Sequence, residues 1–286
     1  MSKKLLFLLS FCILLLVLAA VASRLAQNQF YYPDQIDYGR SPAHYGQTFT
    51  ELTITTADGE QLHGWFVPSQ LHDNPKDALG TILHYHGNAA NITAHYLAVA
   101  WLPGEGYNLI TFDYRGYGKS TGEPSFKGVY QDGISALAFA ENYPEIDPSK
   151  LFVFGQSLGG NVAIASVGSS ATQHVRGMII DSTFYGYSKI ANDKLSGMQW
   201  LVSDEFSAYQ YLDKLHMPIF YFHGDADQLI PHRHSAELFA KTNAPKANMV
   251  LADTRHIEGI FNPQVQDNFL VFLQQALQPG CCNLSP

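Results

Sequence analysis

A serine at position 157 stands in a pattern that places a nucleophile at a sharp turn. Four apolar residues from Leu151 onward run directly into Gly155-Gln-Ser157-Leu-Gly159, and a segment of small residues follows. A strand that turns in this way into a helix strains the serine backbone and holds the hydroxyl at the edge of a sheet, while the glycines avoid collisions with neighbouring elements. The pattern predicts Ser157 as a catalytic nucleophile.

A serine hydroxyl is a weak nucleophile until a base removes its proton. After a nucleophile turn of this kind, the chain order is serine, then acid, then histidine. His256 is the one histidine after His234, and it follows an apolar stretch, Asn248 to Ala252, through a short connection. His256 is therefore the predicted general base.

The acid that orients the histidine is expected in the loop after another apolar run. Tyr221-Phe-His-Gly-Asp225-Ala-Asp227 leaves a strand and enters a loop that ends at Pro231. Asp227 lies deeper in this loop and is the predicted acid, whereas Asp225 is interpreted as a turn residue whose carboxylate accepts from local backbone amides. Asp181, after an earlier strand, is a more distant candidate.

Two backbone N–H groups are expected to stabilise the charge on a substrate oxygen. One is the amide of Leu158, which follows the nucleophile at the positive end of its helix. The other is predicted at Asn88, because Gly87 permits the backbone turn that would aim this amide at the substrate. Ala89, one position further on, stays open as an alternative.

The elements around these residues alternate between short apolar runs and helical stretches. Thr48–Thr56 and Leu62–Val67 flank the turn signal Asp58-Gly59 and predict an antiparallel hairpin. The later alternation predicts parallel strands joined by helices, so the fold class is α/β, with a mostly parallel eight-stranded sheet and helices on both faces. The other predicted strands are Thr81–Tyr85, Asn108–Asp113, Leu151–Phe154, Gly177–Asp181, Ile219–Phe222 and Asn248–Ala252, and the predicted helices are Ile92–Leu102, Phe126–Tyr143, Val162–Val167, Ser235–Lys241 and Val265–Ala276.

The predicted organisation is one catalytic domain with short appendages. It comprises a signal anchor (1–26), a connector (27–47), the α/β domain (48–278) and a tail (279–286). Residues 183–215 interrupt the strand pattern and are a candidate lid, although a structural helical insertion fits the sequence equally well.

The N-terminus predicts a membrane anchor. Leu5 to Ala22 is an uncharged apolar run, preceded by Lys3 and Lys4, which reaches the lower length limit for a transmembrane helix. The positive flank places the N-terminus in the cytoplasm and the catalytic domain outside it, in the periplasm of a bacterium. Ala20-Val-Ala22 also fits a signal-peptidase site, so secretion after cleavage is the alternative.

Composition argues against other classes of function. A formal net charge of -8 offers no basic field for nucleic acid. Neither the three cysteines nor two spaced histidine pairs supply a ligand set, and Arg115-Gly-Tyr-Gly118 lacks a full dinucleotide fingerprint, so we predict no metal and no cofactor. These residues are Cys12, Cys281 and Cys282, and the pairs His84 with His86 and His232 with His234.

Several motifs together resemble the α/β-hydrolase family, over nearly all of the chain after Thr48. The chain is more narrowly similar to the YfhR-type bacterial hydrolases and the membrane-associated ABHD proteins. This resemblance implies their fold, a triad of Ser157, Asp227 and His256, and often a membrane-proximal acyl substrate. The motifs are Tyr31-Tyr-Pro33, His86-Gly-Asn-Ala, Asp113-Tyr-Arg-Gly-Tyr-Gly-Lys-Ser120, Gly155-Gln-Ser-Leu-Gly-Gly160, His223-Gly-Asp-Ala-Asp227 and His256.

The predicted function is therefore that of a serine hydrolase that cleaves an acyl ester or thioester through an acyl-enzyme. Its predicted partner is a small acyl substrate, which could be a lipid or the acyl group of a modified protein. A peptidase or amidase is the alternative, because the same triad serves both leaving groups. A non-catalytic anchored scaffold is disfavoured, since such a protein could lose any triad member without penalty.

Overall fold

The described chain folds around one mixed sheet. A computed structural model of the protein describes residues 3–28, 30–170 and 174–278, so the predicted tail with Cys281 and Cys282 lies outside the described residues. Within these ranges the sheet has eight strands in the order β1-β2-β4-β3-β5-β6-β7-β8. The strands are β1 (Thr50–Thr55), β2 (Gln61–Val67), β3 (Gly80–Tyr85), β4 (Tyr107–Phe112), β5 (Leu151–Gln156), β6 (Val175–Asp181), β7 (Ile219–Gly224) and β8 (Lys246–Leu251).

Strand directions follow the predicted pattern. β1 pairs with β2 and β2 with β4 in antiparallel fashion, and every later pairing from β4 to β8 is parallel. The predicted α/β fold class is confirmed. The helices are α1 (Lys3–Asn28), α2 (Ile92–His95), α3 (Phe126–Glu141), α4 (Leu158–Ser169), α5 (Tyr187–Lys194), α6 (Arg233–Lys241) and α7 (Pro263–Ala276).

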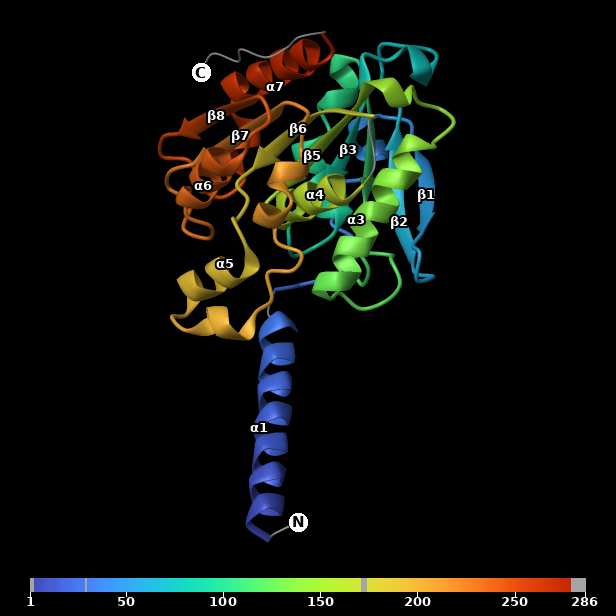
Figure 1. Cartoon of the computed structure of the whole chain (residues 1–286). Helices are drawn as coiled ribbons and strands as arrows, with labels where there is room; N and C mark the ends of the chain where they lie inside the picture. Colours follow the sequence, from blue (N-terminus) through green and yellow to red (C-terminus); the bar gives the residue numbers. More distant parts are fainter. Residues whose placement is uncertain (1–2, 29, 171–173, 279–286) are drawn as a thin grey trace.

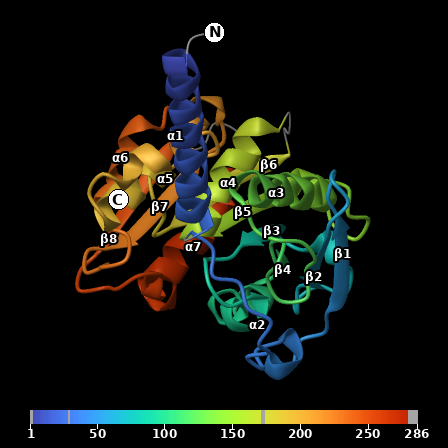
Figure 2. The same cartoon turned by 90° about the horizontal axis from the view of Figure 1, so that it is seen from below.

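Helices cover both faces of the sheet and give the domain two apolar cores. Residues of α3, α4 and α6 pack with one face, and residues of α7 and of the segment that begins at α2 pack with the other. Figures 1 and 2 show these layers. β3, β4 and β5 are buried along their whole length, which explains their nearly continuous apolar sequences.

The predicted helix Ile92–Leu102 is wrong in extent. Asn91 caps α2 by accepting from the backbone N–H of Thr93, but α2 ends at His95. Two short 3₁₀ helices follow, η3 (Tyr96–Ala98) and η4 (Leu102–Glu105). Apolar spacing reports which positions face the core, and a series of short turns buries the same positions as a continuous helix does.

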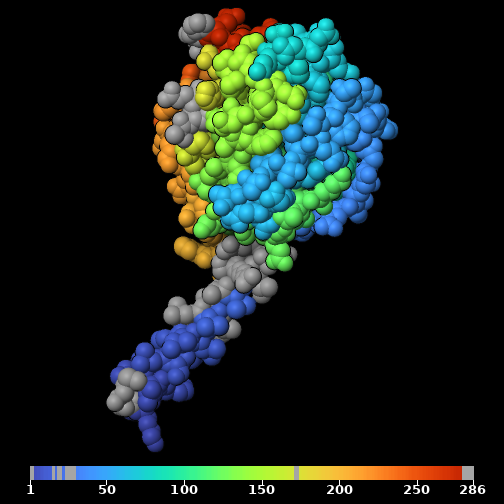
Figure 3. Space-filling model, turned by 90° about the vertical axis from the view of Figure 1, so that its right-hand side faces the viewer, coloured from blue at the N-terminus to red at the C-terminus, as the bar shows by residue number. Residues whose placement is uncertain are grey.

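The N-terminal helix α1 projects from the domain, as Figures 1 and 3 show, and it contacts η6 (Met198–Leu201). Within the described parts of the chain, no helix combines the length and the apolar character needed to cross a membrane. The predicted transmembrane helix at Leu5–Ala22 is therefore not supported. The predicted location outside the cytoplasm stays a prediction.

The segment between β6 and β7 forms a small helical layer at the carboxyl ends of the strands. It contains α5 and η6, and two further 3₁₀ helices, η7 (Ala208–Gln210) and η8 (Leu212–Lys214), bring the chain back to the sheet. Aromatic rings fix this layer internally, with Tyr185 stacked on Tyr209 at a centroid distance of 4.7 Å. Its position relative to the candidate site is described below.

The start of α4 approaches β3 so closely that only glycine fits. A Cβ on Gly159 would lie 2.0 Å from the carbonyl oxygen of Tyr85 and 2.4 Å from that of His86. Both are backbone atoms at the end of a buried strand, so neither can move aside as a side chain would. This contact fixes the nucleophile turn against the loop that follows β3.

We therefore expect Gly159→Ala to be strongly destabilising. Overpacking against fixed backbone should cost at least ~3 kcal/mol and lower Tm by roughly 6–12 °C for a domain of this size. Gly104→Ala is the matched control, because the nearest atom to a Cβ there is Gln70 Oε1 at 3.7 Å. Equal melting temperatures for the two variants in a thermal denaturation experiment would contradict the close approach.

Candidate active site

Ser157 occupies the sharp turn that joins β5 to α4. Its backbone has φ 55° and ψ −119°, a combination that an L-residue adopts only under strain, at a cost of roughly 1–3 kcal/mol. The turn is held by the backbone of β6, because Ser157 N donates to Asp181 O at 2.8 Å, and the Thr183 hydroxyl donates to Ser157 O at 2.5 Å. The strain predicted from Gly-x-Ser-x-Gly is present in the structure.

The structure brings Ser157, His256 and Asp227 together in one hydrogen-bonded series. The Oγ of Ser157 lies 2.9 Å from Nε2 of His256, and Nδ1 of His256 lies 2.6 Å from Oδ2 of Asp227. A carboxylate can only accept, so Nδ1 carries the proton and Nε2 is free to accept the serine proton. This arrangement can activate a hydroxyl as a nucleophile.

Asp227 is held as an anion by four hydrogen bonds. Oδ1 accepts from the backbone N–H groups of Leu229 and Ile230, both at 2.8 Å, and Oδ2 accepts from the rings of His256 and His223. Burial acts to raise the pKa of Asp227, but hydrogen bonds from His223 and His256 outweigh it and hold the pKa well below its usual range.

The two other candidate acids are engaged elsewhere. Asp225 is exposed and its Oδ1 accepts from the backbone N–H of Asp253 at 2.8 Å. Asp181 is buried, and its carboxylate accepts from the side chains of Gln156 and Ser182, both at 2.8 Å. Burial raises the pKa of Asp181. Only Asp227, of these three carboxylates, hydrogen bonds to His256.

The two predicted backbone donors lie on the wall of one cavity that Ser157 also lines. Asn88 and Leu158 both border it. Neither N–H donates a hydrogen bond to any described residue, which leaves both available to a ligand oxygen. The peptide that joins Gly87 to Asn88 is planar, so its carbonyl and its N–H point in opposite directions. Nδ1 of His86 donates to the Gly87 carbonyl at 2.7 Å and thereby sets the direction of the Asn88 N–H.

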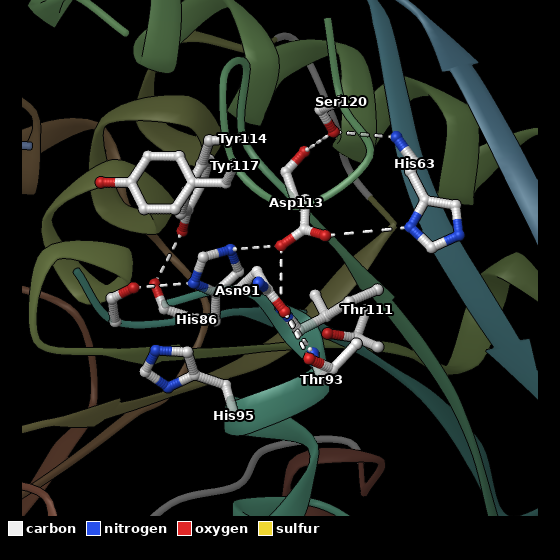
Figure 4. Close-up of polar contacts among 12 residues, drawn as sticks. His63, His86, Asn91, Thr93, His95, Thr111, Asp113, Tyr114, Tyr117 and Ser120 are labelled. Carbon is white, nitrogen blue, oxygen red and sulfur yellow. Dashed lines mark hydrogen bonds and ion pairs between the residues drawn. The ribbon is translucent and has the colours of Figure 1, made fainter. Parts of the chain in front are cut away.

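Asp113 lies beside Nε2 of the His86 ring, on the side away from Nδ1, as Figure 4 shows. Its Oδ1 accepts from the N–H of Ile92 at 2.8 Å and faces Nε2 of His86 at 3.4 Å, and its Oδ2 faces Nδ1 of His63 at 3.8 Å. The carboxylate is buried, which would raise its pKa, but His63 and His86 outweigh burial and lower it. The negative charge of Asp113 therefore lies next to the His86 ring, and this ring orients the Asn88 amide through the Gly87 carbonyl.

A second histidine supports the same loop. His95 stacks on His86 with ring centroids 4.9 Å apart, and its Nε2 donates to the carbonyl oxygen of Ala89 at 3.0 Å. Burial lowers the pKa of His95 to about 4, so this ring is neutral at pH 7. Ala89 and Ala90 both have positive φ, and the hydrogen bond from His95 to Ala89 helps to hold this strained backbone.

The predicted connector also belongs to the site. The side chain of Asn88 donates from Nδ2 to the carbonyl of Phe30 at 2.8 Å and accepts at Oδ1 from the N–H of Tyr32 at 3.0 Å. Pro33 forms a bridge with Ala90. The chain before β1 is thus tied to the loop after β3.

The cavity at Ser157 is apolar and has a volume of about 380 Å³. Besides Asn88, Ser157 and Leu158, its walls come from the connector, the loop after β7 and the segment between β6 and β7, so the candidate lid segment forms part of the wall. Among the described residues on its wall, the one with a charged side chain is Lys194, which donates to the carbonyl of Leu229 at 2.6 Å. Apolar side chains that line the cavity include Phe30, Phe184, Ile190, Leu195, Met198 and Ile230.

Sequence reasoning missed the residues that support the series. His223 donates from Nε2 to Asp227 and to the carbonyl of Ile230, and its Nδ1 accepts from Ser235. The signal for His223 was its place at the end of a strand, four residues before the predicted acid. Asp113 and His86 are far apart in sequence, so only the parallel pairing of β3 with β4 brings them together.

The structure gives His84, His86 and His234, from the two spaced histidine pairs, hydrogen-bond partners within the chain. The fold does place carboxylates beside them that their spacing could not reveal, since Asp193 accepts from Nε2 of His234 at 2.7 Å and Asp113 faces His86. His84 is buried between Thr111 and Gln156. Among the described residues, no group of three or more histidine, cysteine or acidic side chains could hold a metal ion.

Comparison of the sequence with those of known proteins shows the family to which the chain belongs. The protein YfhR of Salmonella typhimurium is 38% identical over 289 residues, which cover 96% of this chain and 95% of YfhR. The sequence profile of the family described as "Serine aminopeptidase, S33" matches residues 76–213. The chain belongs to the YfhR family of α/β hydrolases. The α/β-hydrolase domain-containing protein WAV2 of Arabidopsis thaliana is a more distant relative, 28% identical over 72% of this chain and 71% of its own.

A solved structure supports the same fold. The Pyrococcus furiosus esterase Pf2001 superposes with a TM-score of 0.69 and covers 85% of this chain and 96% of its own, at 23% identity. At this level of identity the likeness extends to the fold alone. The predicted resemblance to the YfhR-type α/β hydrolases is confirmed.

The charge behind His86 can be tested by Asp113→Asn. Asparagine keeps the shape and still accepts from Ile92, but the charge that faces the ring is lost, so the Asn88 amide should be less well aimed. Loss of one such donor costs on the order of 10²–10³ in kcat, and we expect Asp113→Asn to lose about 10-fold or more of hydrolytic kcat with KM little changed.

Asp132→Asn is the matched control for this variant. Asp132 is as fully buried as Asp113, but it pairs with Arg115, whose Nε and backbone N–H donate to it at 2.9 and 2.8 Å. Breaking this pair should lower Tm without lowering kcat. If both variants lost stability and kcat in parallel, Asp113 would have a structural role only.

Proposed function

We propose that this chain is a serine hydrolase that transfers the acyl group of an ester or thioester to water. The observation that carries this proposal is the series of 2.9 and 2.6 Å contacts from Ser157 through His256 to Asp227, at the edge of an apolar cavity. A hydroxyl, a base and an acid in this geometry activate a nucleophile in unrelated folds.

The reaction follows from the positions of these groups. The oxygen of Ser157 attacks the acyl carbon while Nε2 of His256 takes the hydroxyl proton, and the Asn88 and Leu158 amides donate to the resulting oxyanion. The bond to the leaving group then breaks, and His256 returns the proton to it. Water repeats the sequence on the acyl-enzyme with His256 as base, which releases the acid and restores Ser157.

The apolar cavity supports an apolar acyl group as the substrate class. Its volume of about 380 Å³ lies near the lower end of the ~300–1,000 Å³ usual for ligand pockets, which suits a short or medium acyl chain. The ammonium of Lys194, on the same wall, is exposed and donates to the carbonyl of Leu229, and most of the other described lining residues are apolar.

An aminopeptidase is the second candidate, because the matching family profile carries that description. An enzyme of that kind must bind a free α-amino group, and proteins usually do so with a carboxylate. No aspartate or glutamate is among the described residues that line the cavity at Ser157. We therefore favour acyl esters, and parallel assays with acyl esters and aminoacyl anilides would distinguish the two.

The nucleophile can be tested with a fluorophosphonate probe. We expect the wild-type protein to form a covalent adduct on Ser157 and Ser157→Ala to lose both labelling and ester hydrolysis, because the activated oxygen is absent. Intact-protein and peptide mass spectrometry would locate the adduct. An adduct on a different serine in the alanine variant would contradict the assignment.

The acid can be tested by comparing two neighbouring carboxylates. Asp227→Asn should cost on the order of 10⁴ in kcat, because asparagine permits the wrong imidazole tautomer. Asp225→Asn removes only a charge that plays no part in orienting His256, and its amide oxygen still accepts from the backbone N–H of Asp253, so this variant should retain most activity and lose at most roughly 1 kcal/mol in stability. The reverse pattern of kcat values, measured on folded variants, would assign the acid to Asp225.

A further inference from the structure

A second cavity lies beside the catalytic series. It has a volume of about 320 Å³ and is separate from the apolar cavity, although Asn88 lines both. Gln156 and Ile257, the chain neighbours of Ser157 and His256, line it as well. The loop after β3, which carries Asn88, therefore borders two cavities: Ser157 itself lines the apolar one, and the second is bordered by the chain neighbours of Ser157 and His256.

The proposed reaction distinguishes these two cavities. His256 must return a proton to the departing oxygen or sulfur, so the leaving group has to lie on the His256 side of Ser157. The second cavity lies on this side, because Ile257 and Phe261, from the segment that follows His256, form part of its wall. The acyl chain then occupies the apolar cavity beneath α5, and the leaving group occupies the second one.

The second cavity differs from the rest of the protein in charge. The chain as a whole has a net charge of -8, yet no acidic side chain is among the described residues that line this cavity. Arg40 is its one permanently charged lining residue, and the other ionisable residue there, His95, is neutral at pH 7 because burial lowers its pKa to about 4. A solitary guanidinium next to a leaving-group cavity favours an anion.

Arg40 has donors to spare for a ligand. Among the described residues its side chain makes one hydrogen bond, from Nη1 to the carbonyl of Ala94, at the long distance of 3.4 Å. A guanidinium has five N–H donors in a planar fork that matches carboxylate and phosphate oxygens.

We propose that the second cavity is the leaving-group subsite and that Arg40 selects alcohols or thiols that carry a carboxylate or phosphate. This inference rests on the proposed function. The natural substrate is then an ester or thioester with an apolar acyl group at one end and an anionic leaving group at the other. The anionic group takes no part in bond breaking and acts only through binding.

The test compares two esters that differ in charge alone. 4-(Carboxymethyl)phenyl butanoate and 4-(carbamoylmethyl)phenyl butanoate share an acyl chain and have leaving groups of nearly equal size, with the charge insulated from the phenol oxygen by a methylene group. Both form the same butanoyl enzyme, so a difference in kcat/KM arises before deacylation. We expect the wild-type protein to prefer the anionic ester by about 10-fold at low salt, and less at high salt because Arg40 is exposed.

Variants identify the residue responsible for this preference. Arg40→Gln should bring the ratio of the two kcat/KM values close to one, and Arg40→Glu should favour the neutral ester. Arg255→Gln is the matched control, because Arg255 is an exposed arginine beside His256 that pairs with Glu258 and lines neither cavity. It should keep the wild-type ratio.

The outcomes separate this inference from the proposed function. If both esters are cleaved at equal kcat/KM by the wild-type protein, or if Arg40→Gln leaves the ratio unchanged, the anionic subsite is refuted while the serine hydrolase proposal stands. If neither ester is cleaved and Ser157 takes up no fluorophosphonate, the proposed function itself fails.

Discussion

The close approach of α4 to the end of β3 is the constraint on which the site depends. Because Gly159 has no side chain, the first turn of α4 rests on the backbone of Tyr85 and His86. This contact places Ser157 beside the loop that follows β3, so that the Leu158 and Asn88 amides border the same cavity. The strained conformation of Ser157 persists because the surrounding strands and this contact determine it.

Two buried carboxylates orient two different histidines near Ser157. Asp227, after β7, accepts from His256 and so fixes the base, whereas Asp113, after β4, faces His86 and supports the oxyanion loop. Each carboxylate also accepts from backbone N–H groups, which replaces the water that burial removes. His256 and the loop after β3 are therefore each supported by a carboxylate of their own.

Much of this arrangement could be predicted because it is encoded locally. The turn around Ser157, the loop with Asp227 and the strand before His256 each have their own sequence pattern, and the eight strands were found within a few residues of their observed ends. What escaped prediction depends on distant contacts. The break in the helix after His95 and the pairing of Asp113 with His86 follow from packing between segments that periodicity treats separately. The hydrogen bonds that tie the connector to Asn88 could not be predicted from residue types, since Phe30 and Tyr32 contribute only backbone atoms to them.

The walls of the apolar cavity have a consequence for how such proteins diversify. Apart from Asn88, Ser157 and Leu158, they come from the connector, the segment between β6 and β7 and the loop after β7, and none of the described lining residues lies within a strand of the sheet. Substitutions at Phe30, Ile190 or Met198 can therefore reshape the cavity without disturbing the pairing of strands or the contact at Gly159. Natural variation on these segments can change which ligands the cavity accepts, while selection for folding acts on the sheet. The fold of the sheet can therefore be older in evolution than the ligand specificity of any one protein that has it.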